Sequence, residues 1–350
     1  MTQDGPKPKQ EPKPGSASGR RVVLAGLAGL ACGALLLSAC TTKPQVQSSQ
    51  SATVRELVFA RTADATSTTL ANAYVGMLEA AGIQAKVGEP VADPVAEVLD
   101  GKADAVVAGS GDLLAALDKQ APAGSAPATG SGSPSAPATG SGSPSAPTPG
   151  TVPPPNAEQV LKALHGMDLG GFALLDSAEA TRTGTLVVTA ATSAGMNLST
   201  LAQLPALCPE LDLGVPKPLS AGLLPVLEDI HACKPHHVVQ VVPQDEAPVG
   251  PLITGQVQVL ATTSDNAGIQ DNGLVPVQDA QTLFTPQTLT PLTTTRQIGQ
   301  DAIDAMNKVS AALKQEDLIA LNRAVTGRDA LSPEQAARDW LREKSLVAAP

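Results

Sequence analysis

The sequence has very few aromatic side chains, with three Phe, one Tyr and one Trp among 350 residues. So few rings exclude a surface that stacks nucleic-acid bases on aromatic side chains. Positive charge is also in short supply, because 33 acidic residues outnumber 23 basic ones and the net charge is −10. A nucleic-acid-binding protein presents a basic face to the phosphates. We therefore expect no nucleic-acid partner.

Catalytic motifs are absent as well. The four His residues do not stand with a Ser or Cys in a nucleophile motif, and there is no HExxH zinc motif, P-loop or GxGxxG fingerprint. Four Cys are too few for a disulfide-rich scaffold. We expect neither an enzyme nor a protein that requires a cofactor or a metal.

Glycine and proline are abundant, with 31 of each, which indicates that part of the chain is not globular. The decapeptide SAPATGSGSP occurs at 125–134 and again at 135–144. A stretch of this composition buries no apolar surface and cannot offset the entropy lost on ordering. We predict a disordered insertion over 120–155.

The N-terminus has the pattern of an export signal. Residues 1–21 are basic, an apolar run of about sixteen residues covers 22–37, and the run ends in Leu37-Ser38-Ala39-Cys40. This ending resembles the lipobox of bacterial lipoproteins, in which the Cys is lipidated and begins the mature chain. The resemblance implies a signal peptide at 1–39, a lipid anchor on Cys40, a tether at 40–53 and a location on the outer face of the cell membrane.

Some questions about this segment remain open. An ordinary signal anchor with an incidental Cys is the alternative to lipidation, and Arg20-Arg21 permits twin-arginine export beside Sec export. Because 1–39 contains five basic and two acidic side chains, removing it takes the net charge from −10 to −10 − 3 = −13. An acidic domain of this kind has no electrostatic reason to lie on an anionic membrane.

Short apolar runs alternate with stretches of helical spacing from Val54 onward, and the pattern resumes after the insertion. We predict strands at 57–60, 83–87, 103–107, 172–175, 186–189, 213–215, 238–242, 257–261 and 274–277. We predict helices at 70–81, 94–99, 112–119, 157–164, 223–230, 299–313, 316–324 and 332–346. This alternation is typical of the α/β class with a largely parallel sheet.

Three segments carry a family resemblance: GKADAVVAGSGDLLAAL at 101–117, DNGLVPVQDAQTLF at 271–284 and the block at 311–346. They resemble the substrate-binding lipoproteins of osmoprotectant ABC transporters of the glycine betaine/choline type. The resemblance implies a two-lobed, type II periplasmic-binding-protein-like fold with two hinge strands. Lobe one would comprise 54–185 and 265–350, and lobe two 186–264. The implied partners are a small polar solute, either a quaternary amine or an amino-acid-like molecule, and an ABC permease, and we expect a monomer.

The aromatic cage of that family is missing here. Relatives hold a quaternary ammonium between aromatic rings, and their cage-type tyrosines near the third strand align with Val106 and Gly109. Only Ser110 and Gly111 of the local Tyr-Thr-Gly remain, and the loop after the first strand reads Arg61-Thr62-Ala63-Asp64. We predict that the fold is retained while the solute is held by polar groups instead of rings.

The candidate ligand-binding residues lie at predicted strand ends, where clefts of such sheets bind ligands. The Arg61 guanidinium suits a carboxylate or phosphate, although a surface arginine is the plain alternative. For the others the alternative is turn or cap chemistry. The full set is Arg61, Thr62, Asp64, Ser110, Gly111, Thr189, Thr263, Ser264, Asp265 and Asn266.

Cys208 and Cys233 are the remaining cysteines of the mature chain. Outside the membrane we expect them to form a disulfide. The alternative is a metal site that combines both cysteines with His236 and His237, because Cys-x-x-His is a ligand spacing.

Two functions are consistent with this sequence. The first is a lipid-anchored, extracytoplasmic solute-binding protein of an ABC importer that captures a small polar solute by lobe closure. The second is a degenerate solute-binding fold that serves as a structural or accessory envelope lipoprotein without transport. A cleft filled by apolar side chains such as Val106 would favour the second.

Overall fold

The computed structural model describes residues 56–120, 151–242, 249–296, 298–327 and 330–348. The predicted signal peptide, Cys40, the tether and most of the predicted insertion lie outside these ranges. Within the described residues, no helix has the length and apolar character needed to cross a membrane.

The first of two five-stranded sheets has the strand order β2-β1-β3-β10-β4. Strands β1, β2 and β3 are parallel, whereas β10 runs antiparallel to both β3 and β4. The bounds are Leu57–Arg61 for β1, Ala85–Pro90 for β2, Ala105–Gly109 for β3, Phe172–Leu174 for β4 and Leu289–Thr294 for β10.

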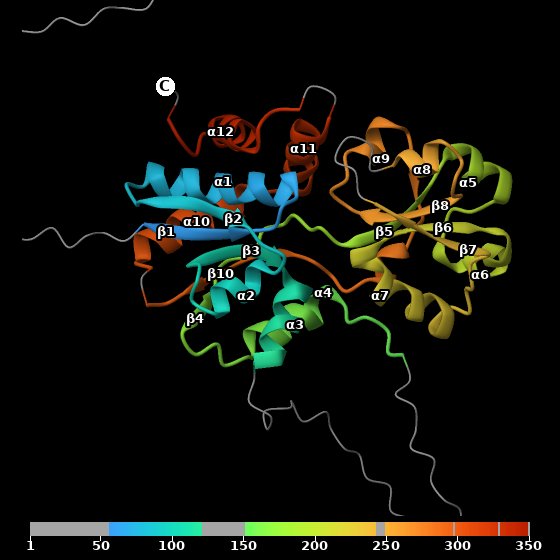
Figure 1. Ribbon diagram of the computed structural model, residues 1–350, viewed down its shortest axis with the longest axis horizontal. Coiled ribbons are helices and arrows are strands. Elements are labelled where there is room, and N and C mark those ends of the chain that lie inside the picture. Colours follow the sequence, from blue (N-terminus) through green and yellow to red (C-terminus); the bar gives the residue numbers. More distant parts are fainter. Residues whose placement is uncertain (1–55, 121–150, 243–248, 297, 328–329, 349–350) are drawn as a thin grey trace, which may run out of the picture. The chain divides into compact units, whose positions relative to one another are not determined.

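Helices cover both faces of this sheet (Figure 1). One face packs against α1 (Ala65–Ala80) and α10 (Gln300–Ala312), and α11 (Gln315–Thr326) and α12 (Pro333–Glu343) pack against α1 on the side away from the sheet (Figure 1). The other face packs against α2 (Pro94–Leu99), α3 (Ser110–Gln120) and α4 (Ala157–His165). The central helix α1 begins where Asp64 accepts a hydrogen bond from the Ser67 backbone N–H, and the chain turns at Gly82, whose φ of 79° favours glycine.

The second sheet has the order β7-β6-β8-β5-β9 and repeats the same plan. Strands β6, β7 and β8 are parallel, and β5 runs antiparallel to β8 and β9. The bounds are Gly184–Val188 for β5, Asp212–Pro216 for β6, His237–Val241 for β7, Val259–Thr263 for β8 and Val275–Pro276 for β9.

Short helical segments surround the second sheet (Figure 1). They are α5 (Ala190–Met196), η1 (Leu201–Gln203), α6 (Leu204–Leu207), η2 (Cys208–Glu210), α7 (Lys217–Pro225), the π-helical η3 (Val226–Ile230), α8 (Gly250–Ile253), α9 (Gly268–Asp271) and η4 (Ala280–Leu283). Leucines and valines from both faces of the sheet fill its two apolar clusters.

Two crossing segments join the sheets, and we call them the crossing strands: residues 175–183, between β4 and β5, and residues 285–288, between η4 and β10. They pair with each other, since Thr181 bridges Thr288 in antiparallel register. The Arg182 N–H donates to the Gln287 carbonyl at 2.9 Å. The two-lobed α/β fold with two hinge strands, predicted from the sequence, is thus present.

Two parts of the prediction need correction. Residues 265–284, expected in lobe one, belong with the second sheet, because β9 pairs with β5 and Leu283 and Phe284 pack into its core. The sheets are also mixed instead of largely parallel, because each places an antiparallel strand beside its three parallel ones. In the first sheet this strand is β10, which the sequence analysis did not predict.

Candidate ligand-binding site

Charged side chains meet at the crossing strands, and Arg182 is at their centre. Its Nε donates to Asp265 Oδ2 at 2.9 Å, and its Nη2 lies 3.4 Å from Asp64 Oδ1. Asp64 caps α1 of the first half, whereas Asp265 follows β8 of the second. One guanidinium therefore connects carboxylates from both halves.

Asp64 and Arg182 stabilise each other's charged forms. Burial opposes the charge on Asp64, but Arg182 and hydrogen bonds from Thr62 and Ser67 outweigh it and hold the pKa of Asp64 below its ordinary value. Burial likewise opposes the charge of Arg182, yet Asp265 and Asp64 raise the pKa of Arg182. Asp112 also interacts with Arg182, although burial raises the pKa of Asp112, so the carboxylates that act on Arg182 outnumber it.

One carboxylate oxygen of Asp265 accepts no hydrogen bond from the part of the chain that the structure describes. Its side chain is only 1% exposed, and its Oδ1 atom has no hydrogen-bond partner among the described residues. A buried carboxylate oxygen without a donor is costly. The arrangement suits a ligand that brings an N–H or O–H group.

The loop after β1 holds its own side chains in place. The Thr62 hydroxyl donates to Asp64 Oδ2, and the Thr62 N–H donates to Ser67 Oγ. Arg61, the predicted ligand arginine, donates instead to the carbonyls of Gly88 and Thr62 and to Thr68 Oγ1. The described contacts thus make Arg61 a support for the loop.

Ser110 and Gly111 join the start of α3 to the second crossing strand. The buried Ser110 hydroxyl donates to the Pro286 carbonyl at 3.1 Å, and the Thr288 N–H donates back to Ser110 Oγ at 3.2 Å. A Cβ at Gly111 would stand 2.5 Å from Thr285 Cγ2, so only glycine permits this close approach. Both residues lie at the site, where they hold the start of α3 against the second crossing strand.

Gln287 fills the space beside Gly109. A Cβ at Gly109 would stand 2.0 Å from Gln287 Oε1. The same amide accepts from the Asp112 N–H at 3.2 Å and donates to Asp112 Oδ1 at 3.0 Å. Gln287 therefore occupies the direction in which a side chain at 109 would point, and a cage tyrosine aligned there has no room.

The four predicted residues 263–266 lie at the end of β8 and in the turn that follows it. Thr263 ends the strand opposite Gly184, and the Ser264 hydroxyl donates to the Thr181 carbonyl at 2.9 Å. Asn266 donates to Thr262 Oγ1 and accepts from the Gly268 N–H. They lie beside Asp265 and the first crossing strand, as the sequence predicts.

Thr189 does not join this group. It caps α5 after the last residue of β5, and β5 is antiparallel to β8, with Gly184 opposite Thr263. Thr189 therefore lies at the opposite end of the strands from Thr263. The five residue steps from Gly184 to Thr189 span about 16 Å at 3.3 Å per residue. The prediction treated β5 as parallel, which is why it placed Thr189 with the others.

All five aromatic rings lie among the described residues, and they pack into the apolar clusters of the two halves. Phe59 and Tyr74 stack with centroids 5.5 Å apart, and Trp340 is 4% exposed in the same core. Phe172 packs on the other face of the first sheet, and Phe284 packs in the second half. No ring remains for a cage, as predicted.

Sequence reasoning missed Arg182, Asp112 and Gln287. Arg182 stands two residues before the buried strand β5, close to the predicted lobe boundary, and that position was the available signal. Asp112 and Gln287 are 175 residues apart in sequence, and no local pattern connects them.

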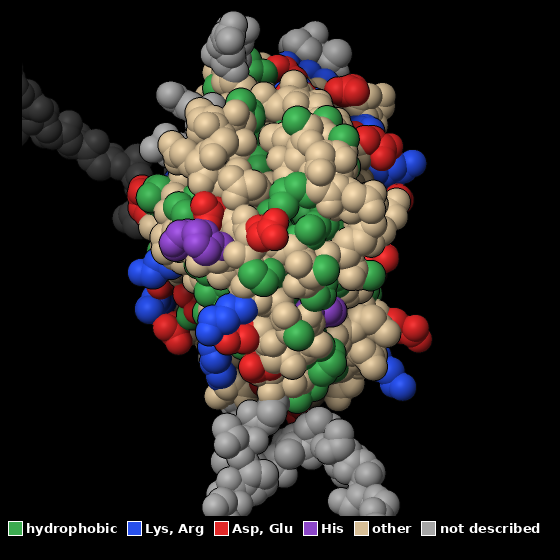
Figure 2. Space-filling view, turned by 90° about the vertical axis from the view of Figure 1, so that its right-hand side faces the viewer, with side chains coloured by type: hydrophobic (Ala, Val, Ile, Leu, Met, Phe, Trp, Pro, Cys, Tyr) green, Lys and Arg blue, Asp and Glu red, His purple; other side chains and the backbone are tan. Residues whose placement is uncertain are grey.

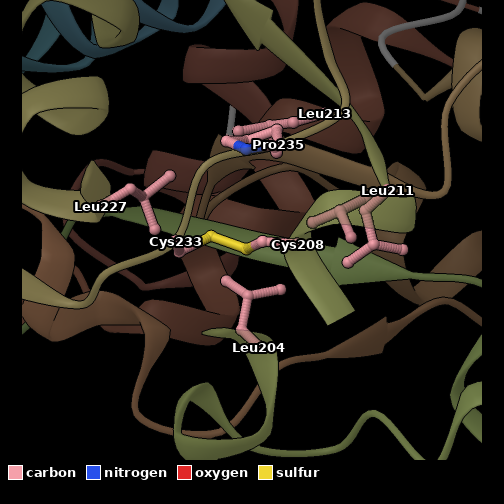
Figure 3. Close-up of a pocket in the computed structure, with 8 residues that line it drawn as sticks. Leu204, Cys208, Leu211, Leu213, Leu227, Cys233 and Pro235 are labelled. Atoms are coloured by element: carbon pink, nitrogen blue, oxygen red, sulfur yellow. A yellow bond between two sulfur atoms is a disulfide. The ribbon is translucent and has the colours of Figure 1, made fainter. Parts of the chain in front are cut away.

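The predicted disulfide between Cys208 and Cys233 is present, with a Cα–Cα distance of 5.4 Å. Figure 3 shows it among Leu204, Leu211 and Leu227, in a small apolar pocket of the second half. This pocket has no polar lining suited to a small polar solute. A metal site that uses both cysteine sulfurs is wrong, because the sulfurs are bonded to each other.

Residues 252–343 match the family model of the substrate-binding domain of the ABC-type glycine betaine transport system. No curated protein matches the sequence. The structure is similar to a glycine betaine/carnitine/choline ABC transporter, with a TM-score of 0.64 at 15% identity over 83% of this chain and 99% of that one.

Two further solved structures are similar. Unliganded YehZ from Escherichia coli has a TM-score of 0.58 at 19% identity and covers 83% of this chain and 99% of its own. The glycine betaine/L-proline-binding protein of Borrelia burgdorferi has a TM-score of 0.54 at 9% identity, covering 83% and 93%. The resemblance to glycine betaine-type substrate-binding proteins is thus confirmed by the family model over residues 252–343, and the described chain has the type II periplasmic-binding-protein-like fold of these structures.

Proposed function

We propose that this protein is the extracytoplasmic solute-binding protein of an ABC importer. It binds a small polar solute at the crossing strands, and ligand contacts to both halves favour a closed arrangement that docks on the permease. The observation that carries the proposal is Arg182, which contacts Asp64 from one half and Asp265 from the other.

The charges define the solute class. Excess carboxylate favours a cationic amine or the ammonium of an amino-acid-like solute, while Arg182 can take a carboxylate. The buried Oδ1 of Asp265 accepts a hydrogen bond that a quaternary amine cannot donate. We therefore expect a solute with N–H donors to bind better than glycine betaine or choline. Thr62, Asp64, Ser264, Asp265 and Arg182 would contact it, and Arg61, Ser110, Gly111, Thr263 and Asn266 would position them.

The proposed anchor is a diacylglyceryl group on Cys40, which would hold a monomer at the outer face of the membrane. Replacing Cys40→Ser is expected to release the protein from the membrane fraction and abolish labelling by radioactive palmitate. Cys32→Ser is the matched control and should change neither. Retention of label in the Cys40→Ser variant would contradict the anchor without affecting solute binding.

The accessory-lipoprotein alternative gains no support. It calls for apolar side chains in the cleft, yet Val106 is fully buried between the first sheet and α2–α4. The side chains that meet at the crossing strands are charged and polar instead.

The test is thermal unfolding of the full chain, purified in detergent, against amino acids, polyamines, ectoine, carnitine, choline and glycine betaine. A solute at one hundred times its Kd adds about 2.7 kcal/mol. For a chain of this size the melting temperature should rise by roughly 2–4 °C per kcal/mol.

Two variants make the test specific. Arg182→Met should abolish the shift, whereas Arg338→Met, an exposed arginine paired with Glu334 on α12, should keep it. A flat panel with a cooperatively unfolding protein would contradict the proposal. An equal shift in the Arg182→Met variant would place the site elsewhere.

A further inference from the structure

Three side chains of metal-ligating type converge at the edge of the second sheet: Asp212, His236 and His237. They stand where the parallel strands β6 and β7 begin, whereas the crossing strands join the sheet where β8 ends. Figure 2 shows histidine side chains at the surface beside acidic ones at this end of the molecule. The cluster is therefore separate from the proposed solute site.

The two imidazoles share one carboxylate oxygen. Nδ1 of His236 lies 3.1 Å and Nδ1 of His237 lies 2.9 Å from Asp212 Oδ1. The ring centroids are 3.8 Å apart in a T-shaped arrangement. All three ligand atoms lie within 4.8 Å of one another. Two nitrogens and one oxygen thus lie close enough together to be candidate ligands of one ion.

The backbone fixes this arrangement. Asp212 and His237 are direct partners in the β6–β7 register. The His236 N–H donates to the carbonyls of Cys208 and Leu211 at 3.0 and 2.9 Å, and the Asp212 N–H donates to Gln258 Oε1 at 2.9 Å. The disulfide joins the segments that precede both sides of the cluster. Little ordering entropy therefore remains to be lost when a ligand binds.

We propose that Asp212, His236 and His237 form a binding site for a divalent transition-metal ion, with zinc as the test ion. Two imidazoles with one carboxylate are ligands that zinc and copper accept, whereas magnesium and calcium prefer oxygen alone. Three protein ligands leave a coordination position for water or for a group of another molecule.

The distances between Asp212 Oδ1 and the two Nδ1 atoms are close to those between ligands of one zinc ion. Two ligands of one tetrahedral zinc ion, each about 2.1 Å from the metal, lie about 3.4 Å apart. The Nδ1 atoms need to move by only a few tenths of an ångström from the carboxylate oxygen. Each ring then carries its proton on Nε2, and both rings are exposed to solvent at 57% and 63%. Binding replaces two hydrogen bonds to Asp212 with three bonds to the ion.

The test is calorimetric titration of the full chain in detergent with zinc chloride. Free thiols are first alkylated, which leaves the Cys208–Cys233 disulfide intact. One equivalent of zinc should bind, while magnesium chloride and calcium chloride should give no binding heat. Cobalt chloride in place of zinc should give the visible absorption of a four-coordinate nitrogen–oxygen site.

Variants assign the ligands. His236→Ala, His237→Ala and Asp212→Asn should each weaken zinc binding by about tenfold or more, and His236→Ala/His237→Ala should abolish it. His231→Ala, a neighbouring histidine outside the cluster, is the matched control and should bind like the original chain. Circular dichroism verifies that each variant is folded. Absence of stoichiometric binding, or unchanged binding in the double variant, would overturn the proposal.

Discussion

The two halves of the molecule share one strand plan but are stabilised by different means. Each sheet has three parallel strands followed by an antiparallel strand and an edge strand. The first half covers its sheet with long helices, including α1 of 16 residues and α10 of 13. The longest helix in the second half, α7, has nine residues. Two sheets with the same strand arrangement can therefore be covered by helices of very different length.

The cores differ in the same way. The first half buries Phe59, Tyr74 and Trp340 under its helices, and large rings remove much apolar surface from water. The second half has Phe284 alone and closes with the Cys208–Cys233 disulfide. The disulfide stabilises the second half by restricting the conformations of its unfolded chain.

Removing the disulfide tests the second half most directly. The Cys208→Ala/Cys233→Ala variant should lose about 3.5 kcal/mol of unfolding free energy, the chain-entropy value for a loop of 25 residues. Denaturant titration measures the loss. Hydrogen exchange should show faster opening of β6 and β7 but not of β1 and α1. Equal acceleration in both halves would show that they unfold as one unit.

Breaking the link between the halves should be nearly as costly. Arg182→Met leaves Asp265, 1% exposed, without its counter-charge, and we expect a loss of about 3 kcal/mol. In Arg182→Met/Asp265→Asn the buried charge is gone, so much of the loss should be recovered. Arg338→Met should stay within about 0.5 kcal/mol of the original chain. A loss that the double variant does not recover would contradict this electrostatic account.

The first half depends on a buried polar pair. The Tyr74 hydroxyl lies 2.9 Å from Ser310 Oγ, with both side chains at most 1% exposed. Tyr74→Phe leaves the serine hydroxyl unsatisfied and should cost roughly 1–2 kcal/mol. Tyr74→Phe/Ser310→Ala should be closer to the original chain than Tyr74→Phe is. Denaturant titration of both variants gives the comparison, and a double variant that is less stable still would contradict it.

The smallest effect is a pH dependence at Asp64. Because its pKa is held below the ordinary value of about 3.9, the ionised form stabilises the fold above that pH. This contribution is lost as the pH falls through the folded-state pKa. Asp64→Asn retains the helix cap but should flatten the acid limb of stability against pH below about pH 5. Asp118→Asn, an exposed carboxylate on α3, should leave that limb unchanged, and an unflattened limb in Asp64→Asn would contradict the assignment.

Three errors in the sequence-based prediction have identifiable physical causes. The strand at 289–294 was missed because Pro291 stands in its middle and proline lacks a donor. In the structure Pro291 still accepts from the Leu175 N–H, and β10 is an interior strand of the first sheet, between β3 and β4. Thr189 was placed at the wrong edge because strand direction is not visible in a single apolar run. Arg61 was predicted because it follows a clear strand, whereas Arg182 stands in a segment that no predicted element covers.

Composition and local patterns were enough to predict the α/β class, the two-lobed family resemblance, the absence of an aromatic cage and the cysteine pair. Three properties depend on the packing of the folded chain: which strand runs antiparallel, that 265–284 joins the second sheet, and that Arg182 meets Asp64 and Asp265. These contacts join residues 83 to 118 positions apart, by the numbers of Arg182, Asp265 and Asp64. Contacts over such separations depend on the packing of whole elements, which no local pattern contains.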